Sequence, residues 1–344
     1  MTGIGIVGCG YISQFQLQGL KQAGGRLVAA CDINADAAKK AAEPFKARCY
    51  TDYDKLLADK DVQAVIISMP NYLHFEFAGK ALAAGKHVFC EKQMTTKLAD
   101  SEKLVDIVRK SGKVFQVGYM KRFNPAFGQI KKELPKAGRI FGATIKLYCA
   151  IHERPSKAAD PKTAVWQNIP EKAGGGFLVH SASHLLDLMQ YTFGPPVKVW
   201  GKLLRDPSGN EYDINAVFLM ESDYFIHFQM GLLLVPRVGL QNTFWEETVE
   251  VASDQALIRA EGSDWQGMGP AGIMIRQKDS GITSQIFPDA LSQWTGEFEA
   301  FLKGIEQGKC LACDVTQGYR VDKILDVMKK LEFSRDQIEF NFKY

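Results

Sequence analysis

Short apolar runs alternate with amphipathic segments over the first third of the chain. The apolar runs have the length of buried strands and lie at 3–8 (GIGIVG), 27–31 (LVAAC), 62–68 (VQAVIIS), 86–90 (KHVFC) and 114–117. The segments between them have helical spacing and lie near 11–23, 35–43, 52–58, 71–85 and 98–110. Strands that alternate with helices predict a parallel sheet, in which ligands bind at the carboxyl ends of the strands.

The pattern changes after Tyr119. Six strand-like runs follow, at 140–150, 197–204, 212–220, 224–234, 246–252 and 257–260. Turn signals separate them, and the connections hold no helix long enough for a crossover, which predicts a largely antiparallel sheet. Final helices are predicted near 296–307 and 316–332. We therefore expect a parallel α/β domain over 1–120, followed by an α+β domain over 121–344 with a large, open, mainly antiparallel sheet.

Composition argues against several classes of partner. The 344 residues include 42 basic and 39 acidic side chains, a net charge of +3, and no basic block, so we expect no nucleic-acid partner. The longest apolar runs, such as 231–235, are far shorter than a membrane span. Seven scattered cysteines favour a reducing compartment, and the first strand lies too near Met1 to leave room for a signal peptide. These features predict a cytoplasmic protein.

The first predicted strand ends in a glycine-rich turn, Gly8-Cys9-Gly10-Tyr11-Ile12-Ser13. This spacing is typical of dinucleotide-binding turns, in which the first glycine makes the tight turn, the second admits the pyrophosphate and the third position needs only a small residue. The helix that follows offers free N–H groups to the phosphates. The second strand ends at Asp32, where a carboxylate would accept hydrogen bonds from ribose hydroxyls and repel a 2′-phosphate. Because neither of the next two residues is an arginine, NAD is favoured over NADP.

Two later strands also end at residues suited to a ligand site. Pro70 and Asn71 follow the third predicted strand, and Asn71 is a suitable N-cap for a helix that carries His74. Glu91 and Lys92 follow the fourth. A lysine partly desolvated at a sheet end has a lowered pKa and can serve as the acid or base of a hydride-transfer reaction. The structural alternative is an ion pair between Lys92 and Glu91.

A predicted helix over 177–193 carries a polar stripe. At helical spacing His180, His184, Asp187 and Tyr191 fall on one side and apolar residues on the other, so the stripe faces either solvent or a cleft. His180 and His184 are also spaced as metal ligands often are, with Asp187 as a third candidate. Because the sequence marks no fourth ligand and a lysine base needs no metal, we predict no metal site.

Together these segments resemble the glucose-fructose oxidoreductase/inositol dehydrogenase (Gfo/Idh/MocA) family. The matching motifs occur in order: GCGYIS at 8–13, CD at 31–32, MPNYLH at 69–74, EKQ at 91–93, GYMKRFNP at 118–125 and GGGFLVHSASHLLDL at 174–188. The resemblance implies a Rossmann domain, then an open-sheet domain through which the chain forms homodimers or homotetramers. It also implies NAD(P)-dependent oxidation or reduction of sugars, cyclitols or their derivatives.

The resemblance further implies roles for individual residues. Lys92 matches the lysine of the family's Glu-Lys-Pro motif, which relays a proton or binds a substrate hydroxyl, and His184 matches the usual catalytic base. The expected catalytic residues are Lys92, His184 and His180. The expected cofactor contacts are Gly8, Gly10, Tyr11, Ile12, Asp32, Pro70, Asn71, His74, Glu91 and Lys92. The expected substrate contacts are Lys92, Arg122, Trp166, His180 and His184.

Two positions depart from the family pattern. Gln93 replaces the proline after Lys92, which loosens the backbone and leaves the lysine in place. His180 replaces the aspartate that usually contacts a substrate hydroxyl or orients the catalytic histidine. Since a histidine can donate as well as accept a hydrogen bond, this replacement indicates a shift in regiochemistry or substrate class.

Three functions fit these features. The favoured one is an NAD-dependent oxidoreductase that transfers a hydride between nicotinamide and a polyhydroxylated substrate, a sugar, cyclitol or glycoside. The second is an enzyme with tightly bound NAD, in which transient oxidation of a sugar drives elimination or glycoside cleavage without net NADH. The third is a non-catalytic NAD-bound sensor or regulator, which would need neither Lys92 nor His184.

Overall fold

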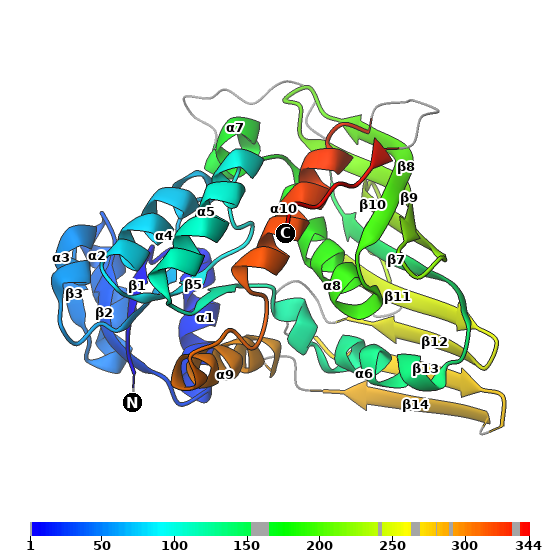
Figure 1. The fold of residues 1–344 in the computed structure, drawn as a ribbon, viewed down its shortest axis with the longest axis horizontal. Coiled ribbons are helices and arrows are strands. Elements are labelled where there is room, and N and C mark those ends of the chain that lie inside the picture. Colours follow the sequence, from blue (N-terminus) through cyan, green and yellow to red (C-terminus); the bar gives the residue numbers. More distant parts are fainter. Residues whose placement is uncertain are drawn as a thin grey trace.

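The fold is built on two sheets that lie side by side (Figure 1). The computed structural model describes residues 2–152, 165–239, 243–262, 269–279, 281–288, 292–331 and 338–344. Residues 153–164 and residue 332 of the last predicted helix lie outside this part of the chain. Within it, no helix has the length and apolar character needed to cross a membrane.

The first sheet is parallel throughout, with the strand order β3-β2-β1-β4-β5-β6. Its strands are β1 (Gly3–Val7), β2 (Arg26–Cys31), β3 (Arg48–Tyr50), β4 (Ala64–Ile67), β5 (His87–Cys90) and β6 (Phe115–Val117). Its helices are α1 (Tyr11–Gln22), α2 (Ala35–Ala42), α3 (Tyr53–Ala58), α4 (His74–Ala83) and α5 (Leu98–Ser111). The predicted parallel domain is confirmed. β3 was not predicted, because its three residues are largely exposed and form no apolar run.

The second sheet has the order β14-β13-β12-β11-β7-β10-β9-β8-β15. Its strands are β7 (Ile140–Ala150), β8 (Pro196–Arg205), β9 (Glu211–Met220), β10 (Phe225–Leu233), β11 (Trp245–Ser253), β12 (Ala256–Glu261), β13 (Ala271–Gln277), β14 (Gly281–Phe287) and β15 (Ile338–Glu339). Among the described strands of this sheet, only β7 and β10 pair in parallel, so the prediction of a mainly antiparallel sheet is confirmed. β13 and β14 were not predicted; nearly all of β14 is exposed, and it carries no buried alternation.

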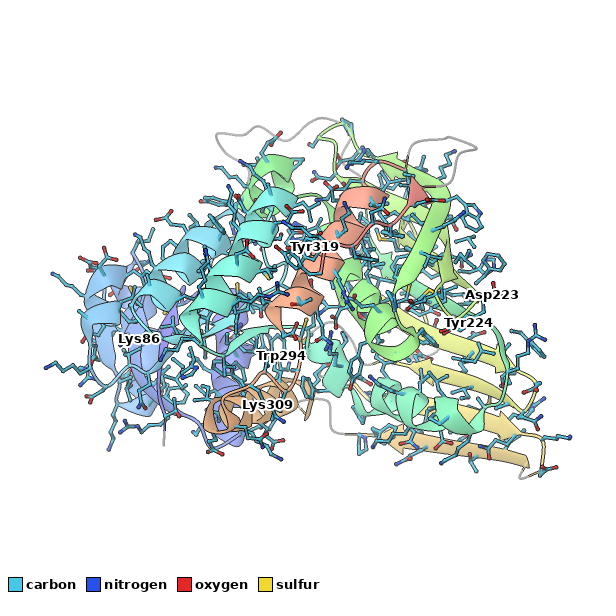
Figure 2. All side chains as sticks on the ribbon, viewed as in Figure 1. Lys86, Asp223, Tyr224, Trp294, Lys309 and Tyr319 are labelled. Atoms are coloured by element: carbon cyan, nitrogen blue, oxygen red, sulfur yellow. The ribbon has the colours of Figure 1, made fainter. Side chains whose placement is uncertain are left out.

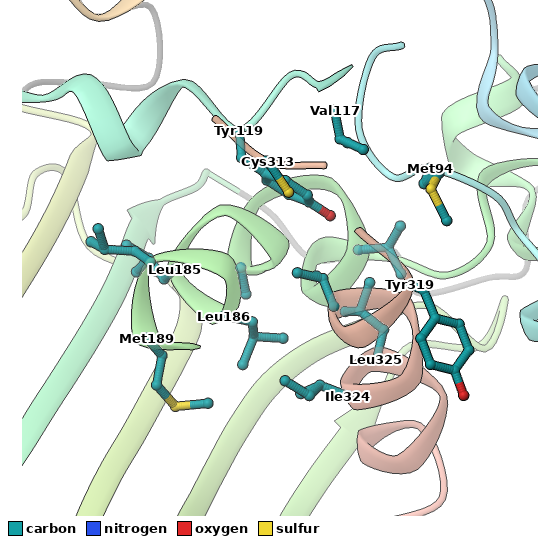
Figure 3. Packing of buried hydrophobic residues seen from close by; sticks show 14 of the residues in the cluster. Met94, Val117, Tyr119, Leu185, Leu186, Met189, Cys313, Tyr319, Ile324 and Leu325 are labelled. Atoms are coloured by element: carbon teal, nitrogen blue, oxygen red, sulfur yellow. The ribbon is translucent and has the colours of Figure 1, made fainter. Parts of the chain in front are cut away.

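Helices cover one face of the large sheet (Figure 1). They are α6 (Pro125–Glu133), which contacts β12 and β13, and α8 (Ser183–Phe193), which contacts β7. A π-helical turn, Leu178–Ala182, precedes α8, so the predicted helix over 177–193 is not uniform. Leu185, Leu186 and Met189 of α8 are buried against the sheet and the neighbouring helix α10 (Val315–Met328; Figure 3).

The last two helices connect the two halves of the molecule, each of which consists of one sheet and its helices. α9 (Ser292–Gln307) packs against α1, and the ring of Phe298 stacks on Phe89 of β5 with centroids 4.7 Å apart. α10 (Val315–Met328) packs on both α5 and α8. Trp294 lies at the junction of the halves and stacks on Phe15 (Figure 2). Helix α9 lies beyond residue 120 and yet completes the core of the first sheet. The predicted domain boundary at residue 120 therefore remains a prediction.

Candidate active site

The glycine-rich turn has the geometry that a dinucleotide needs. Gly8 has a φ of 87°, and a Cβ there would overlap the carbonyl oxygen of Ser68, so only glycine fits. A Cβ at Gly10 would instead meet no atom of the described residues within 4 Å, which leaves the backbone open to a phosphate. No side chain in this part of the chain caps the N-terminus of α1. Ser13 is buried and donates to the Gly10 carbonyl at 2.6 Å, so this position accommodates a small polar residue in place of a third glycine.

A groove of about 700 Å³ begins at this turn and follows the carboxyl ends of the strands. We call it the cofactor groove. Predicted residues that line it are Gly8, Gly10, Tyr11, Ile12, Asp32, Pro70, Asn71, Glu91, Lys92, Trp166 and His180. Asp32 is held by two backbone N–H groups, from Cys9 at 2.8 Å and Asn34 at 2.9 Å. Its carboxylate is thus fixed in the groove, where it can accept further hydrogen bonds.

Asn71 and His74, which follow β4, both bind backbone carbonyl groups. Asn71 begins a 3₁₀ turn, Asn71–Leu73, and its side chain donates to the Ala173 carbonyl at 2.9 Å instead of capping α4, so the N-cap prediction is wrong. His74 is fully buried and lies outside the groove lining. Its Nδ1 is 2.7 Å from the Gln93 carbonyl oxygen and its Nε2 is 2.8 Å from that of Met69. His74 therefore links the Met69 loop to the loop that carries Lys92.

A smaller cavity of about 180 Å³ adjoins the groove, and we call it the catalytic cavity. It is lined by Ile12, Glu91, Lys92, Gly118, Met120, Lys121, His180, Ser181, His184, Trp245, Glu247 and Trp294. Ile12, Glu91, Lys92 and His180 line both spaces. The two spaces thus meet at the predicted catalytic residues.

Lys92 joins the two halves within this cavity. Its ammonium group donates to the His180 carbonyl at 2.6 Å, and burial lowers its pKa. The Glu91 carboxylate accepts instead from the Gln16 amide at 2.8 Å and from the Lys92 backbone N–H at 3.0 Å. These contacts therefore do not support the alternative, in which the side chains of Lys92 and Glu91 form an ion pair. The Lys92–Gln93 peptide bond is cis.

Both cavity histidines are held neutral. Burial, with the nearby positive charges of Lys92 and Lys121, lowers the pKa of His184 well below its usual range. Its buried Nδ1 has no hydrogen-bond partner among the described residues. The pKa of His180 is lowered to about 4 by burial and by Lys92, and its Nε2 lies 3.1 Å from the Gln167 carbonyl oxygen. A neutral imidazole keeps one nitrogen lone pair that can accept a proton.

The predicted polar stripe does not face the cleft as a whole. Asp187 is fully buried, and both its oxygens accept from Arg122, at 2.7 Å each. His180 lies in the π-helical turn Leu178–Ala182, whereas His184 and Asp187 lie on the regular helix α8, so helical spacing does not relate His180 to the later stripe positions. Among the described residues, no group of three or more His, Cys, Asp or Glu side chains is placed to hold a metal ion.

Arg122, a predicted substrate contact, lies outside the lining of the catalytic cavity. Its guanidinium is occupied by Asp187 and, at 3.0 Å, by Gln317. Its neighbour Lys121 lines the cavity instead and pairs with the buried Glu247 at 2.7 Å. The sequence could have indicated that Glu247 is buried. Val249 and Val251 on the same strand are buried, and the two-residue alternation of a strand places Glu247 on the same side.

Comparison with known proteins agrees with this architecture. Residues 2–119 match the model of an oxidoreductase family with an NAD-binding Rossmann fold, and residues 134–253 match the GFO/IDH/MocA C-terminal domain. The chain belongs to the Gfo/Idh/MocA family. An inositol 2-dehydrogenase of Gluconacetobacter diazotrophicus is 39% identical over 281 residues, 77% of this chain and 80% of that protein.

Other members of the Gfo/Idh/MocA family match over different spans. The inositol 2-dehydrogenase of Salmonella typhimurium is 39% identical over 132 residues, which are 37% of this chain and only 39% of that protein's length. A solved levoglucosan dehydrogenase, in complex with NADH and levoglucosan, superposes with a TM-score of 0.83 at 18% identity, covering 99% of each chain. At that identity the likeness supports the fold alone. NAD is the cofactor of this family's N-terminal domain, and Gly10, the α1 N-terminus and Asp32 fit it.

Replacing Asp32 by Ala should weaken NAD binding by about ten- to a hundredfold, the loss expected for hydrogen bonds to a charged group. The variant should also discriminate less between NAD and NADP, because the carboxylate that repels the 2′-phosphate of NADP is gone. Titration of nicotinamide cofactors by fluorescence measures both. Asp36→Ala, which removes an exposed carboxylate four residues away, should change neither. An unchanged cofactor preference in the Asp32 variant would remove Asp32 from the ribose site.

Proposed function

We propose that this protein is an NAD-dependent dehydrogenase that oxidises a secondary alcohol of a sugar, cyclitol or glycoside to a ketone, or reduces the ketone. The observation that carries the proposal is the meeting of Lys92, His184 and His180 in one cavity at the end of the cofactor groove. Relatives named inositol 2-dehydrogenase support the substrate class.

The cavity is suited to a ligand rich in hydroxyl groups. The indole Nε1 of Trp245 and the Nδ1 of His184 are buried and have no hydrogen-bond partner among the described residues. Buried polar atoms without a partner are rare in folded proteins, and a substrate hydroxyl would satisfy both of these. The Lys121–Glu247 pair adds a donor and an acceptor on the same wall. Trp294 contributes an apolar surface.

Each catalytic group has a role that its surroundings support. Bound NAD⁺ supplies the hydride acceptor, C4 of the nicotinamide ring. The Lys92 ammonium, fixed by the His180 carbonyl, donates to the reacting hydroxyl oxygen and stabilises negative charge there. The neutral imidazole of His184 accepts the hydroxyl proton as the C–H bond breaks. The substrate thereby loses one hydride and one proton and becomes a ketone.

The direct test is the absorbance of NADH with purified protein, NAD⁺ and a panel of sugars, cyclitols and glycosides. We expect steady NADH formation with at least one of them. Lys92→Ala should lower kcat by about a hundredfold or more while leaving NAD bound, because the group that stabilises the developing charge is lost. Lys110→Ala, an exposed lysine on α5, is the matched control.

Other outcomes would favour the other two functions. Consumption of a sugar without NADH formation would indicate transient oxidation by a tightly bound NAD that drives elimination or glycoside cleavage. Binding of a sugar with neither consumption nor NADH would indicate a sensor. Near-normal turnover by Lys92→Ala would exclude Lys92 from the chemistry in any of these cases.

The pH dependence of the rate tests the base. Only neutral His184 accepts a proton, so kcat/KM should fall as the pH drops through its lowered pKa. Lys121→Met removes a positive charge that depresses this pKa, so the acidic limb of the profile should move to higher pH. The double variant Lys121→Met/Glu247→Gln should move it in the same direction without leaving an unpaired buried carboxylate. An acidic limb at the same pH in both variants would exclude His184 as its origin.

We also propose that the chain forms homodimers or homotetramers through the outer face of the large sheet, the face opposite α6 and α8. Phe225, Leu257, Ile282 and Ile286 are exposed there, and the ring of Trp200 contacts that of Phe225. Exposed apolar patches of this kind mark protein interfaces. Phe225→Lys should lower the mass measured by light scattering, whereas Leu311→Lys, on the loop before α10, should not. A wild-type chain that is monomeric would contradict the assembly.

A further inference from the structure

A third cavity lies beyond His180. It has a volume of about 330 Å³ and lies between the 3₁₀ turn Trp166–Asn168 and the turn that joins β8 to β9. We call it the side cavity, and define it by Gln167, Phe177, Asp206, Asn210, Tyr212 and Leu232. Its volume is within the range of small-molecule sites.

The side cavity adjoins the proposed reaction site at two points. His180 lines the side cavity, the catalytic cavity and the cofactor groove, so its ring stands where the three spaces meet. Phe177 lines the side cavity, and its ring contacts edge-on that of Trp245 in the catalytic cavity, with centroids 6.0 Å apart. Single side chains therefore separate the two cavities, and a substrate with a reacting ring beside Lys92 can extend past His180.

The lining of the side cavity suits an uncharged, hydroxylated group. Phe177, Tyr212 and Leu232 supply apolar surface of the kind that covers one face of a sugar ring. The buried Oδ1 of Asn210 has no hydrogen-bond partner among the described residues, so it is an acceptor in need of a donor. Arg205 also lines the side cavity and is paired there with Glu211 at 2.7 Å, which argues against a site for phosphate or carboxylate groups.

We propose that the side cavity is a subsite for the second sugar of a glycoside, so that the preferred substrate is a disaccharide-like glycoside whose reacting ring lies in the catalytic cavity. The inference rests on the proposed dehydrogenase function and specifies its substrate class. His180, at the position where the family usually has an aspartate, then contacts the substrate near the glycosidic linkage between the two subsites.

The test compares free hexoses with disaccharides that carry the same hexose at the non-reducing end: glucose with cellobiose and maltose, and galactose with lactose. We expect kcat/KM for NADH formation to be at least about tenfold higher for one of the disaccharides, as contacts in one additional pocket allow. Tyr212→Ala removes an aromatic ring from the lining of the side cavity, and Leu232→Trp fills the cavity with a larger side chain. Each variant should lose this preference and leave the rate with the free hexose unchanged. Tyr212→Phe keeps the ring and should retain most of the preference.

The free hexose serves as the internal control for folding and for NAD binding in every variant. Equal use of hexose and disaccharide by the wild type, or a disaccharide preference that survives both Tyr212→Ala and Leu232→Trp, would overturn the subsite and leave the dehydrogenase function intact. Absence of NADH with every hexose and disaccharide in the wild type would overturn the subsite, and absence of NADH with the full panel of sugars, cyclitols and glycosides would overturn the dehydrogenase function as well.

Discussion

The position of the Lys92 ammonium depends on a buried loop, residues 91–97, that both halves of the molecule hold. On one side, Nδ1 of His74 lies 2.7 Å from a carbonyl oxygen of this loop. On the other, Asp322 of α10 accepts from the Thr95 N–H at 3.1 Å. Lys92 then donates across the cleft to the His180 carbonyl. Because buried polar groups must find partners, these bonds fix the loop, and with it the place where the cofactor groove meets the catalytic cavity.

The return of α9 and α10 to the first sheet gives this arrangement its rigidity. Phe298 and Phe301 of α9 contact Phe89 on β5, the strand that leads directly to Lys92. Figure 3 shows Ile324 and Leu325 of α10 beside the buried face of α8, the helix that carries His184. Cys90 and Met94, on either side of Lys92, belong to the same hydrophobic cluster as Leu185, the residue after His184, so this cluster supports both catalytic residues although they lie in different halves of the chain. The three phenylalanines form part of a second cluster. Close-packed interiors allow little independent movement of such elements.

The electrostatics of the catalytic cavity follow from burial. The Lys92 and Lys121 ammonium groups lie close enough to His184 to disfavour a third positive charge, so the imidazole stays neutral. Glu247 offsets the charge of Lys121 through a contact of 2.7 Å. The cavity therefore combines a charged donor with a neutral acceptor, a pairing that suits the proposed removal of a hydroxyl proton. Neither lysine could be assigned this effect from its position in the sequence alone.

The sequence by itself determined the features that depend on neighbouring residues. The apolar runs, the Gly8 turn, Asp32 at the end of β2 and Lys92 after β5 all follow from local spacing, and the parallel sheet then brings their strand ends together. Only the tertiary structure decided which member of a local cluster faces the cavity. Lys121 and Arg122 are adjacent on a 3₁₀ turn, where successive side chains point in quite different directions, so the docking of that turn selects Lys121 and turns Arg122 to Asp187. Likewise the π-helical turn before α8 breaks the 3.6-residue period between His180 and the later positions of the stripe. Within α8, packing decides that His184 lines the cavity and that Asp187 is buried against Arg122, because helical spacing sets the side of a helix on which a residue lies and not the neighbours that cover it.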